Sequence, residues 1–219
     1  MIKRIAQAVS IIFHPSFLFV FLLWFTYAMD PFSFRINNEK QIAVTMIMTV
    51  VILWLIPLIT TLMMKGLGFI QSLSMEDPKE RIGPLIACII CYVWHYINVY
   101  NNPDFPDSYL VISLGGCISL ALVFFINNFS KISLHTTGAG GFLAGIVILL
   151  SFKFGLPIEF VIGDQVWQVH PILIMMIVLV LSGLIGTSRL IVRAHRPSDV
   201  YGGYLVGIIS MLIASMIVI

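Results

Sequence analysis

The sequence predicts an all-α fold: a polytopic transmembrane helical bundle of six or seven spans. Of its 219 residues, 59% are hydrophobic and only 10% are charged, whereas a soluble domain carries about 25% charged residues. The mean hydropathy is +1.03. The few charges are also grouped, so that seven stretches of the chain contain none. These observations exclude a soluble enzyme, a disordered chain and a disulfide scaffold.

Each charge-free stretch is long enough to cross a membrane as a helix. A helix rises 1.5 Å per residue, so about 20 residues span roughly 30 Å of hydrocarbon. A backbone in lipid must satisfy its own hydrogen bonds, and the stretches lack the alternation of barrel strands, so helices are favoured. In chain order the stretches are 5–29, 41–64, 82–103, 108–130, 132–152, 165–188 and 200–219.

Two of these stretches differ from a plain apolar helix. The third is the weakest candidate span, because it opens at Pro84 and polar residues such as His95 and Asn98 dilute its second half. The first contains His14-Pro15, which suits a kinked or interfacial helix start. Six spans remain if one stretch is re-entrant, and seven if every stretch crosses.

We expect one integral membrane domain over residues 1–219. The connections are short, with neither a domain linker nor an internal repeat. The net charge of +2 is too small and too scattered for a nucleic-acid partner. Cys88, Cys91 and Cys117 all lie within apolar stretches, so we interpret them as small hydrophobic side chains rather than a redox or zinc motif.

Polar residues collect in three connections, 74–84, 131–141 and 188–199. Two expected spans separate the first connection from the second, and two more separate the second from the third. An even number of crossings returns the chain to the same face. The three segments are therefore expected to meet at one end of the bundle and to form an active site at one membrane face.

The side chains of these segments predict a phosphate site. Cationic donors come from Lys79, Arg81 and Arg189, and a hydroxyl comes from Ser133. The glycines of 138–141 are expected to expose backbone N–H groups near the start of the following helix.

Two histidines complete the predicted chemistry. Phosphoryl transfer needs an in-line nucleophile, a proton donor for the departing oxygen and positive charge around the phosphate. His195 matches the nucleophile, because Asp199 four residues later can hold one ring nitrogen and leave the other free. His135 is the candidate acid.

Other residues have simpler interpretations. Basic residues at span ends often only anchor helices in lipid headgroups, and we expect this of Lys3, Arg4, Arg35, Lys40, Lys65 and Lys153. We expect His14, His95 and His170 to be structural. A zinc site of His135, His195 and Asp199 is a rival, but no H-E-x-x-H or other close ligand pair supports it, so no metal is expected.

The third polar connection, 188–199, resembles a signature of the type 2 phosphatidic acid phosphatase superfamily. Members of this superfamily are membrane lipid phosphatases related to acid phosphatases and vanadium haloperoxidases. Ser188, Arg189, His195 and Asp199 stand at all four of its defining positions. The resemblance extends over about 79–206.

Two further signatures of that family are less similar here. The second, normally Pro-Ser-Gly-His, reads Ile-Ser-Leu-His over 132–135. The first, normally a Lys, six residues and Arg-Pro, is represented by Lys79 and Arg81 with one residue between them, followed by Pro84.

The resemblance implies a mechanism without a metal or any other cofactor. His195 attacks phosphorus, Asp199 orients His195, and His135 protonates the leaving group. The residues that would bind phosphate are Arg189, Ser133, Lys79 and Arg81. A site at the membrane surface favours a phosphorylated membrane lipid, such as phosphatidic acid, phosphatidylglycerol phosphate, an isoprenoid phosphate or diphosphate, or a lipid A phosphate.

Hydrolysis of such a lipid is the first prediction, and two alternatives stay open. A phosphotransferase would use the same phosphohistidine but deliver it to an alcohol. A non-enzymatic transporter of anionic lipids would use the basic cluster only for binding, although charge-free spans argue against coupling to ions. We expect the bacterial cytoplasmic membrane. The side of the active site stays open, because six and seven spans give opposite parities, and so does the oligomeric state.

Overall fold

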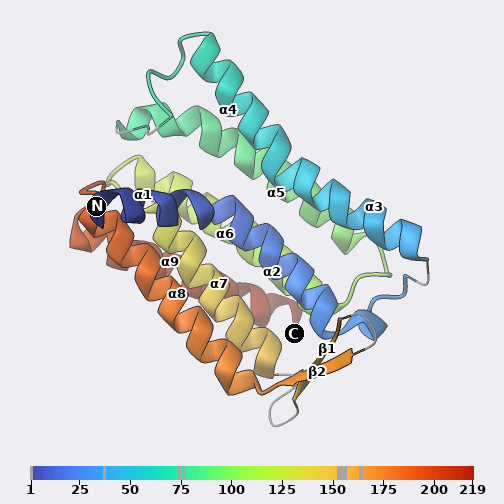
Figure 1. Ribbon diagram of the computed structural model, residues 1–219. Helices are drawn as coiled ribbons and strands as arrows, with labels where there is room; N and C mark the ends of the chain where they lie inside the picture. Colours follow the sequence, from blue (N-terminus) through green and yellow to red (C-terminus); the bar gives the residue numbers. More distant parts are fainter. Residues whose placement is uncertain (1, 37, 74, 76, 152–156, 163–164) are drawn as a thin grey trace.

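A computed structural model describes residues 2–36, 38–73, 75, 77–151, 157–162 and 165–219. It is a helical bundle, which confirms the predicted fold class (Figure 1). The α-helices are α1 (Ile2–Ile12), α2 (Pro15–Met29), α3 (Glu39–Val50), α4 (Ile56–Gly66), α5 (Ile82–Tyr100), α6 (Asp107–Asn127), α7 (Leu134–Ser151), α8 (Pro171–Ile191) and α9 (Pro197–Val218). The shorter elements are η1 (Pro31–Ser33), η2 (Val51–Leu55), η3 (Pro78–Arg81), β1 (Ile158–Ile162) and β2 (Gln165–Val169).

The number of spans also agrees with the prediction. Within the described residues, six helical segments are long and apolar enough to cross a membrane, the first being the continuous helix Lys40–Gly66. A seventh results if α1 and α2, which meet at 49°, form one bent span. The bend falls at His14 and Pro15, as expected, because proline cannot continue α1 but suits the first turn of α2.

Two details of the helices were not predicted. The charge-free stretch 165–188 begins as β2, which pairs antiparallel with β1 in a two-stranded hairpin, and its helix starts only at Pro171. The span Lys40–Gly66 widens into a π-helix, η2, just before Pro57. Pro57 has no N–H for the carbonyl of Leu53, so the regular hydrogen-bond ladder is interrupted there.

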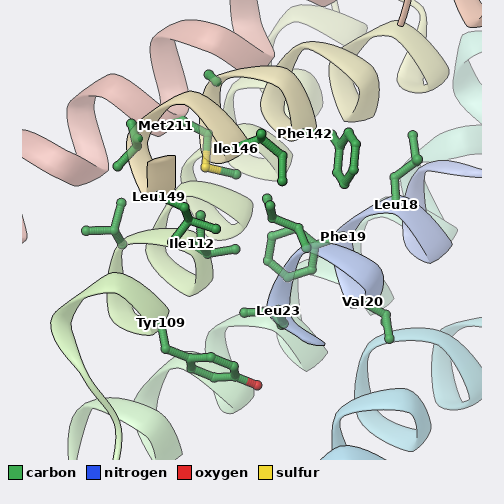
Figure 2. Packing of buried hydrophobic residues seen from close by; sticks show 14 of the residues in the cluster. Leu18, Phe19, Val20, Leu23, Tyr109, Ile112, Phe142, Ile146, Leu149 and Met211 are labelled. Atoms are coloured by element: carbon green, nitrogen blue, oxygen red, sulfur yellow. The ribbon is translucent and has the colours of Figure 1, made fainter. Parts of the chain in front are cut away.

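Helix α7 lies at the centre of the bundle. Within its span window 67% of the residues are buried, against 17% for Lys40–Gly66, which therefore faces mostly outward. Figure 2 shows the packing around α7, with Phe19 from α2, Ile112 from α6 and Met211 from α9 meeting Ile146. These contacts pack α7 against α2, α6 and α9.

Glycines bring α7 and α9 into close contact. A β-carbon at Gly207 would overlap the carbonyl oxygen of Thr137 and lie 2.5 Å from the backbone nitrogen of Gly141. A β-carbon at Gly140 would lie 2.5 Å from the carbonyl oxygen of Tyr204. The expectation that glycines 138–141 expose N–H groups is therefore wrong: they lie within α7 and serve helix packing.

A substitution at this contact should destabilise the protein. In Gly207→Ala the new methyl group must push α7 and α9 apart, and overpacking typically costs about 1–3 kcal/mol. Gly202→Ala is the matched control on the same helix, because its β-carbon would meet nothing within 4 Å and alanine favours a helix. Thermal unfolding in detergent measures both. Equal midpoints for the two variants would contradict the close packing.

Candidate active site

The three polar segments meet at one end of the bundle, as predicted. A guanidinium nitrogen of Arg81, Nη1, donates to the carbonyl of Ile132 at 3.1 Å. The backbone N–H of Ser133 donates to the carbonyl of Asp199 at 3.2 Å. The first hydrogen bond joins the segment before α5 to the segment before α7, and the second joins the latter to the start of α9 (Figure 1).

His195 and Asp199 are held by the start of α9. Pro197 opens the helix, and the backbone N–H of Arg196 donates to Oδ2 of Asp199 at 3.0 Å. This bond directs the same oxygen toward Nδ1 of His195, 3.5 Å away. That distance is long for a hydrogen bond but places the carboxylate in contact with the ring. His195 itself lies before α9, whereas Asp199 lies in the first turn of that helix.

The surroundings of His195 keep its ring neutral. Its side chain is only 4% exposed. Burial is the largest cause that lowers the pKa of His195 to about 4, and the charges of Arg189, Arg81 and Lys131 lower it further while Asp199 opposes them. At neutral pH the imidazole is therefore uncharged. With its proton on Nδ1, facing Asp199, its Nε2 carries a lone pair.

Two arginines supply hydrogen-bond donors. Arg81 is 7% exposed, and its Nε donates to the carbonyl of Met75 at 2.9 Å while Nη1 donates to Ile132. A guanidinium has five N–H groups, so others stay available. Arg189, in the last turn of α8, has a buried Nε with no hydrogen-bond partner among the described residues. A buried donor without a partner is costly, and an anion would relieve that cost.

His135 lies in the first turn of α7 and contacts the N-terminal helix α1. Its Nε2 is 3.0 Å from the backbone carbonyl of Ser10. Because a carbonyl only accepts, Nε2 must be the donor, which leaves Nδ1 for another partner. Ser10 in turn contacts Ser188, the neighbour of Arg189, through their hydroxyl groups at 3.1 Å. Helix α1 thus contacts His135 and the residue that precedes Arg189.

The structure does not bring two of the predicted phosphate ligands to this site. The side chain of Lys79 is exposed, and its backbone N–H donates to Asp77 at the start of η3. Ser133 is 0% exposed, and its hydroxyl is 3.5 Å from the backbone nitrogen of Thr136 at the start of α7. Neither residue lines the cavity described next. Neither side chain therefore lies where a phosphate in that cavity would contact it.

A cavity of about 340 Å³ connects the polar residues to the apolar interior of the bundle. Such a volume suits a small-molecule site. The polar side chains gathered at one part of its wall are His14, Arg81, His135, Arg189 and His195. The large apolar side chains that line the rest include Phe19, Leu22, Trp54, Tyr92, Leu120 and Phe142. The cavity is therefore complementary to an amphiphile that has an anionic group at one end and an apolar chain at the other.

Sequence reasoning missed two features of the site. His14 was expected to be structural only, yet it lines the cavity and its ring meets that of His135 edge to face, with centroids 5.5 Å apart. Lys131 was not singled out, yet its charge acts on His195. The only signal for His14 was its place beside a proline in a broken span.

The comparisons with known proteins point to one family. A family model described as the PAP2 superfamily matches residues 91–218, from the middle of α5 to the end of α9. The matched part contains His135, Arg189, His195 and Asp199 but not Arg81. No curated protein and no solved structure matches the chain. Among the described residues, no three His, Cys, Asp or Glu side chains are grouped so that they could hold a metal ion.

Proposed function

Because that model covers more than half of its residues, the chain belongs to the PAP2 superfamily, and we propose that it hydrolyses a phosphate monoester or diphosphate of a membrane lipid through a phosphohistidine. Members of this superfamily are generally phosphatases. One observation carries the lipid part of the proposal: the cavity joins three histidines and two arginines to an apolar interior. A phosphate fits the former, and a hydrocarbon chain fits the latter.

Substrate binding begins with the two arginines. The free N–H groups of Arg81 and the unpartnered Nε of Arg189 donate to the non-bridging oxygens of the phosphate. Lys131 adds positive charge nearby. Negative charge develops on these oxygens in the transition state, so fixed donors lower the barrier.

His195 then attacks the phosphorus. Its Nε2 forms a bond to phosphorus while the bond from phosphorus to the leaving oxygen breaks, and the imidazole becomes positively charged. The Asp199 carboxylate, 3.5 Å from Nδ1, stabilises that charge. The burial that keeps His195 neutral before the attack also keeps the nucleophile available at neutral pH.

His135 transfers the proton in both half-reactions. With Nε2 held by the carbonyl of Ser10, the protonated ring donates from Nδ1 to the leaving oxygen. In the second half-reaction His135 takes a proton from water, the oxygen of which attacks phosphorus. The phosphorus–nitrogen bond breaks, inorganic phosphate is released, and His195 returns to its neutral form.

The membrane is part of the proposal. Apolar helices make this a membrane protein, and a site at the end of the bundle would take lipid phosphates at the level of the headgroups. Proteins of bacterial outer membranes cross as barrels, so a helical bundle favours the bacterial cytoplasmic membrane.

Release of inorganic phosphate from lipid phosphates by the purified protein in detergent tests the function. We expect turnover that persists in EDTA and is inhibited by vanadate, which imitates five-coordinate phosphorus. Adding an alcohol measures how much phosphate goes to an acceptor other than water. Absence of turnover with every lipid phosphate, or activity lost in EDTA and restored by zinc or magnesium, would reject the proposal.

Alanine substitutions at Lys79 and Arg81, the two residues of the first family signature, should affect the rate differently. Arg81→Ala removes a donor at the cavity, and loss of one such donor typically lowers kcat by about 10² to 10³. Lys79→Ala should keep the wild-type rate, because Lys79 is exposed and outside the cavity. Steady-state kinetics of both variants, with thermal unfolding to verify that they are folded, decides the matter. A comparable loss in Lys79→Ala would mean that the η3 turn moves when substrate binds.

A further inference from the structure

Two histidines start helices of this protein in the same way. Each precedes a proline, His14-Pro15 at α2 and His170-Pro171 at α8, and each has extended backbone. In both, the ring Nδ1 accepts the backbone N–H two residues later, at 3.4 Å for His14 and 3.3 Å for His170. A side-chain acceptor at this position satisfies one of the free N–H groups of a helix start. Helix capping is therefore a local role that the two histidines share.

The surroundings of the two rings are different. His170 is exposed, at the end of α8 far from Arg189. His14 is also exposed, but it lines the cavity and packs its ring at 83° against that of His135. Capping explains His170 completely but does not explain why a second imidazole stands beside the proposed acid.

His14 has one unused donor. Because Nδ1 accepts from Ser16, the proton of a neutral ring belongs on Nε2. Among the described residues, Nε2 has no hydrogen-bond partner. The donor belongs to a side chain that borders the cavity, so it is available to a bound molecule.

The position of His14 along the cavity indicates what it would contact. The wall residues at the start of α2 run from polar to apolar: His14, Pro15 and Ser16 come first, and Phe19 and Leu22 follow. His14 also touches His135 rather than His195. A substrate with its phosphate at His195, its leaving oxygen at His135 and its chain in the apolar part would place its leaving group beside His14.

We propose that His14 is a further substrate-binding residue, which donates its Nε2 proton to an oxygen of the leaving group other than the one protonated by His135. This inference rests on the proposed function. The oxygen can belong to the second phosphate of a lipid diphosphate or to the glycerol portion of a phosphatidic acid. In both cases His14 donates a hydrogen bond to an oxygen of the leaving group, and only the substrate that carries this oxygen differs.

The substitution His14→Asn separates this role from capping. Asparagine is among the best helix-capping residues, so α2 keeps its acceptor while the imidazole is lost. His170→Asn is the matched control, because it changes the same cap away from the cavity. Three substrates distinguish the sources: farnesyl diphosphate, lysophosphatidic acid, and dodecyl phosphate, the leaving group of which has a single oxygen.

We expect His14→Asn to lower kcat/KM about 10- to 100-fold for farnesyl diphosphate, for lysophosphatidic acid or for both, as for a lost hydrogen bond to a polar substrate. The substrate for which kcat/KM falls identifies the source of the oxygen. For dodecyl phosphate the loss should stay below about 3-fold, and vanadate inhibition should be unchanged, since vanadate has no leaving group. His170→Asn should match the wild type throughout.

Two results would overturn the assignment. A uniform loss for all substrates, with weaker vanadate inhibition, would mean that His14 only supports the fold of the site. Rates for His14→Asn that equal those of His170→Asn would leave His14 with capping alone. In both cases the wild type remains active. If instead the wild type hydrolyses none of the three substrates, the proposed function itself fails, and this inference fails with it.

Discussion

Replacing His195 with alanine should abolish turnover together with any acid-labile phosphoenzyme. His195 combines a neutral ring, a carboxylate 3.5 Å from Nδ1, and two arginines that line the same cavity. No other described histidine has a carboxylate in contact with its ring. The loss should reach the rate of the uncatalysed background, because the covalent intermediate cannot form.

Rapid quench of labelled lipid phosphate, followed by an alkaline gel, measures this phosphoenzyme. His170→Ala is the control, because that ring is exposed and outside the cavity. Asp199→Asn should show an intermediate loss. Its amide oxygen can still accept the N–H of Arg196 at the start of α9, but it no longer stabilises a charged imidazole. A phosphoenzyme that persists in His195→Ala would show that another residue is the nucleophile.

Replacing His135 with alanine should produce a loss that depends on the leaving group. An alkoxide leaves poorly without a proton, so a lipid phosphate ester should lose about 10² to 10⁴ in rate. A p-nitrophenolate leaves unaided, so the aryl phosphate should lose roughly 10-fold or less. The contact between His135 and the Ser10 carbonyl positions the ring but should not alter this distinction.

The ratio of kcat/KM for the two substrate types, in wild type and variant, measures the effect. Thermal unfolding of His135→Ala shows whether loss of the bond to Ser10 also loosens α1. Equal losses for the alkyl and aryl substrates would mean that His135 binds or positions the phosphate instead of protonating the leaving group.

The positions of the helices can be predicted from the sequence, because the free-energy cost of placing a side chain in hydrocarbon depends on that side chain alone. A charge is costly in hydrocarbon wherever it lies in the chain, so the charge-free stretches locate the helices and an even number of crossings brings the three polar segments together. The spacing of Arg189, His195 and Asp199 is short, so a single helix end and the following turn bring these side chains together.

The tertiary structure decided which other residues reach the cavity. Arg81 is buried while Lys79, two residues earlier, is exposed, because the η3 turn aims only Arg81 at the carbonyls of Met75 and Ile132. The sequence around Arg81 does not predict its contact with Ile132, which lies 51 residues later in the chain.

The same is true of Ser133 and His14. Ser133 has the residue type that a phosphate site needs, but close packing of α7 on Gly203 of α9 buries it. His14 resembles an ordinary helix cap in sequence, yet the bend between α1 and α2 places its ring against His135. The sequence by itself determined the spans and singled out His195 as the proposed nucleophile. Helix packing, which depends on contacts between distant residues, decided which side chains line the cavity.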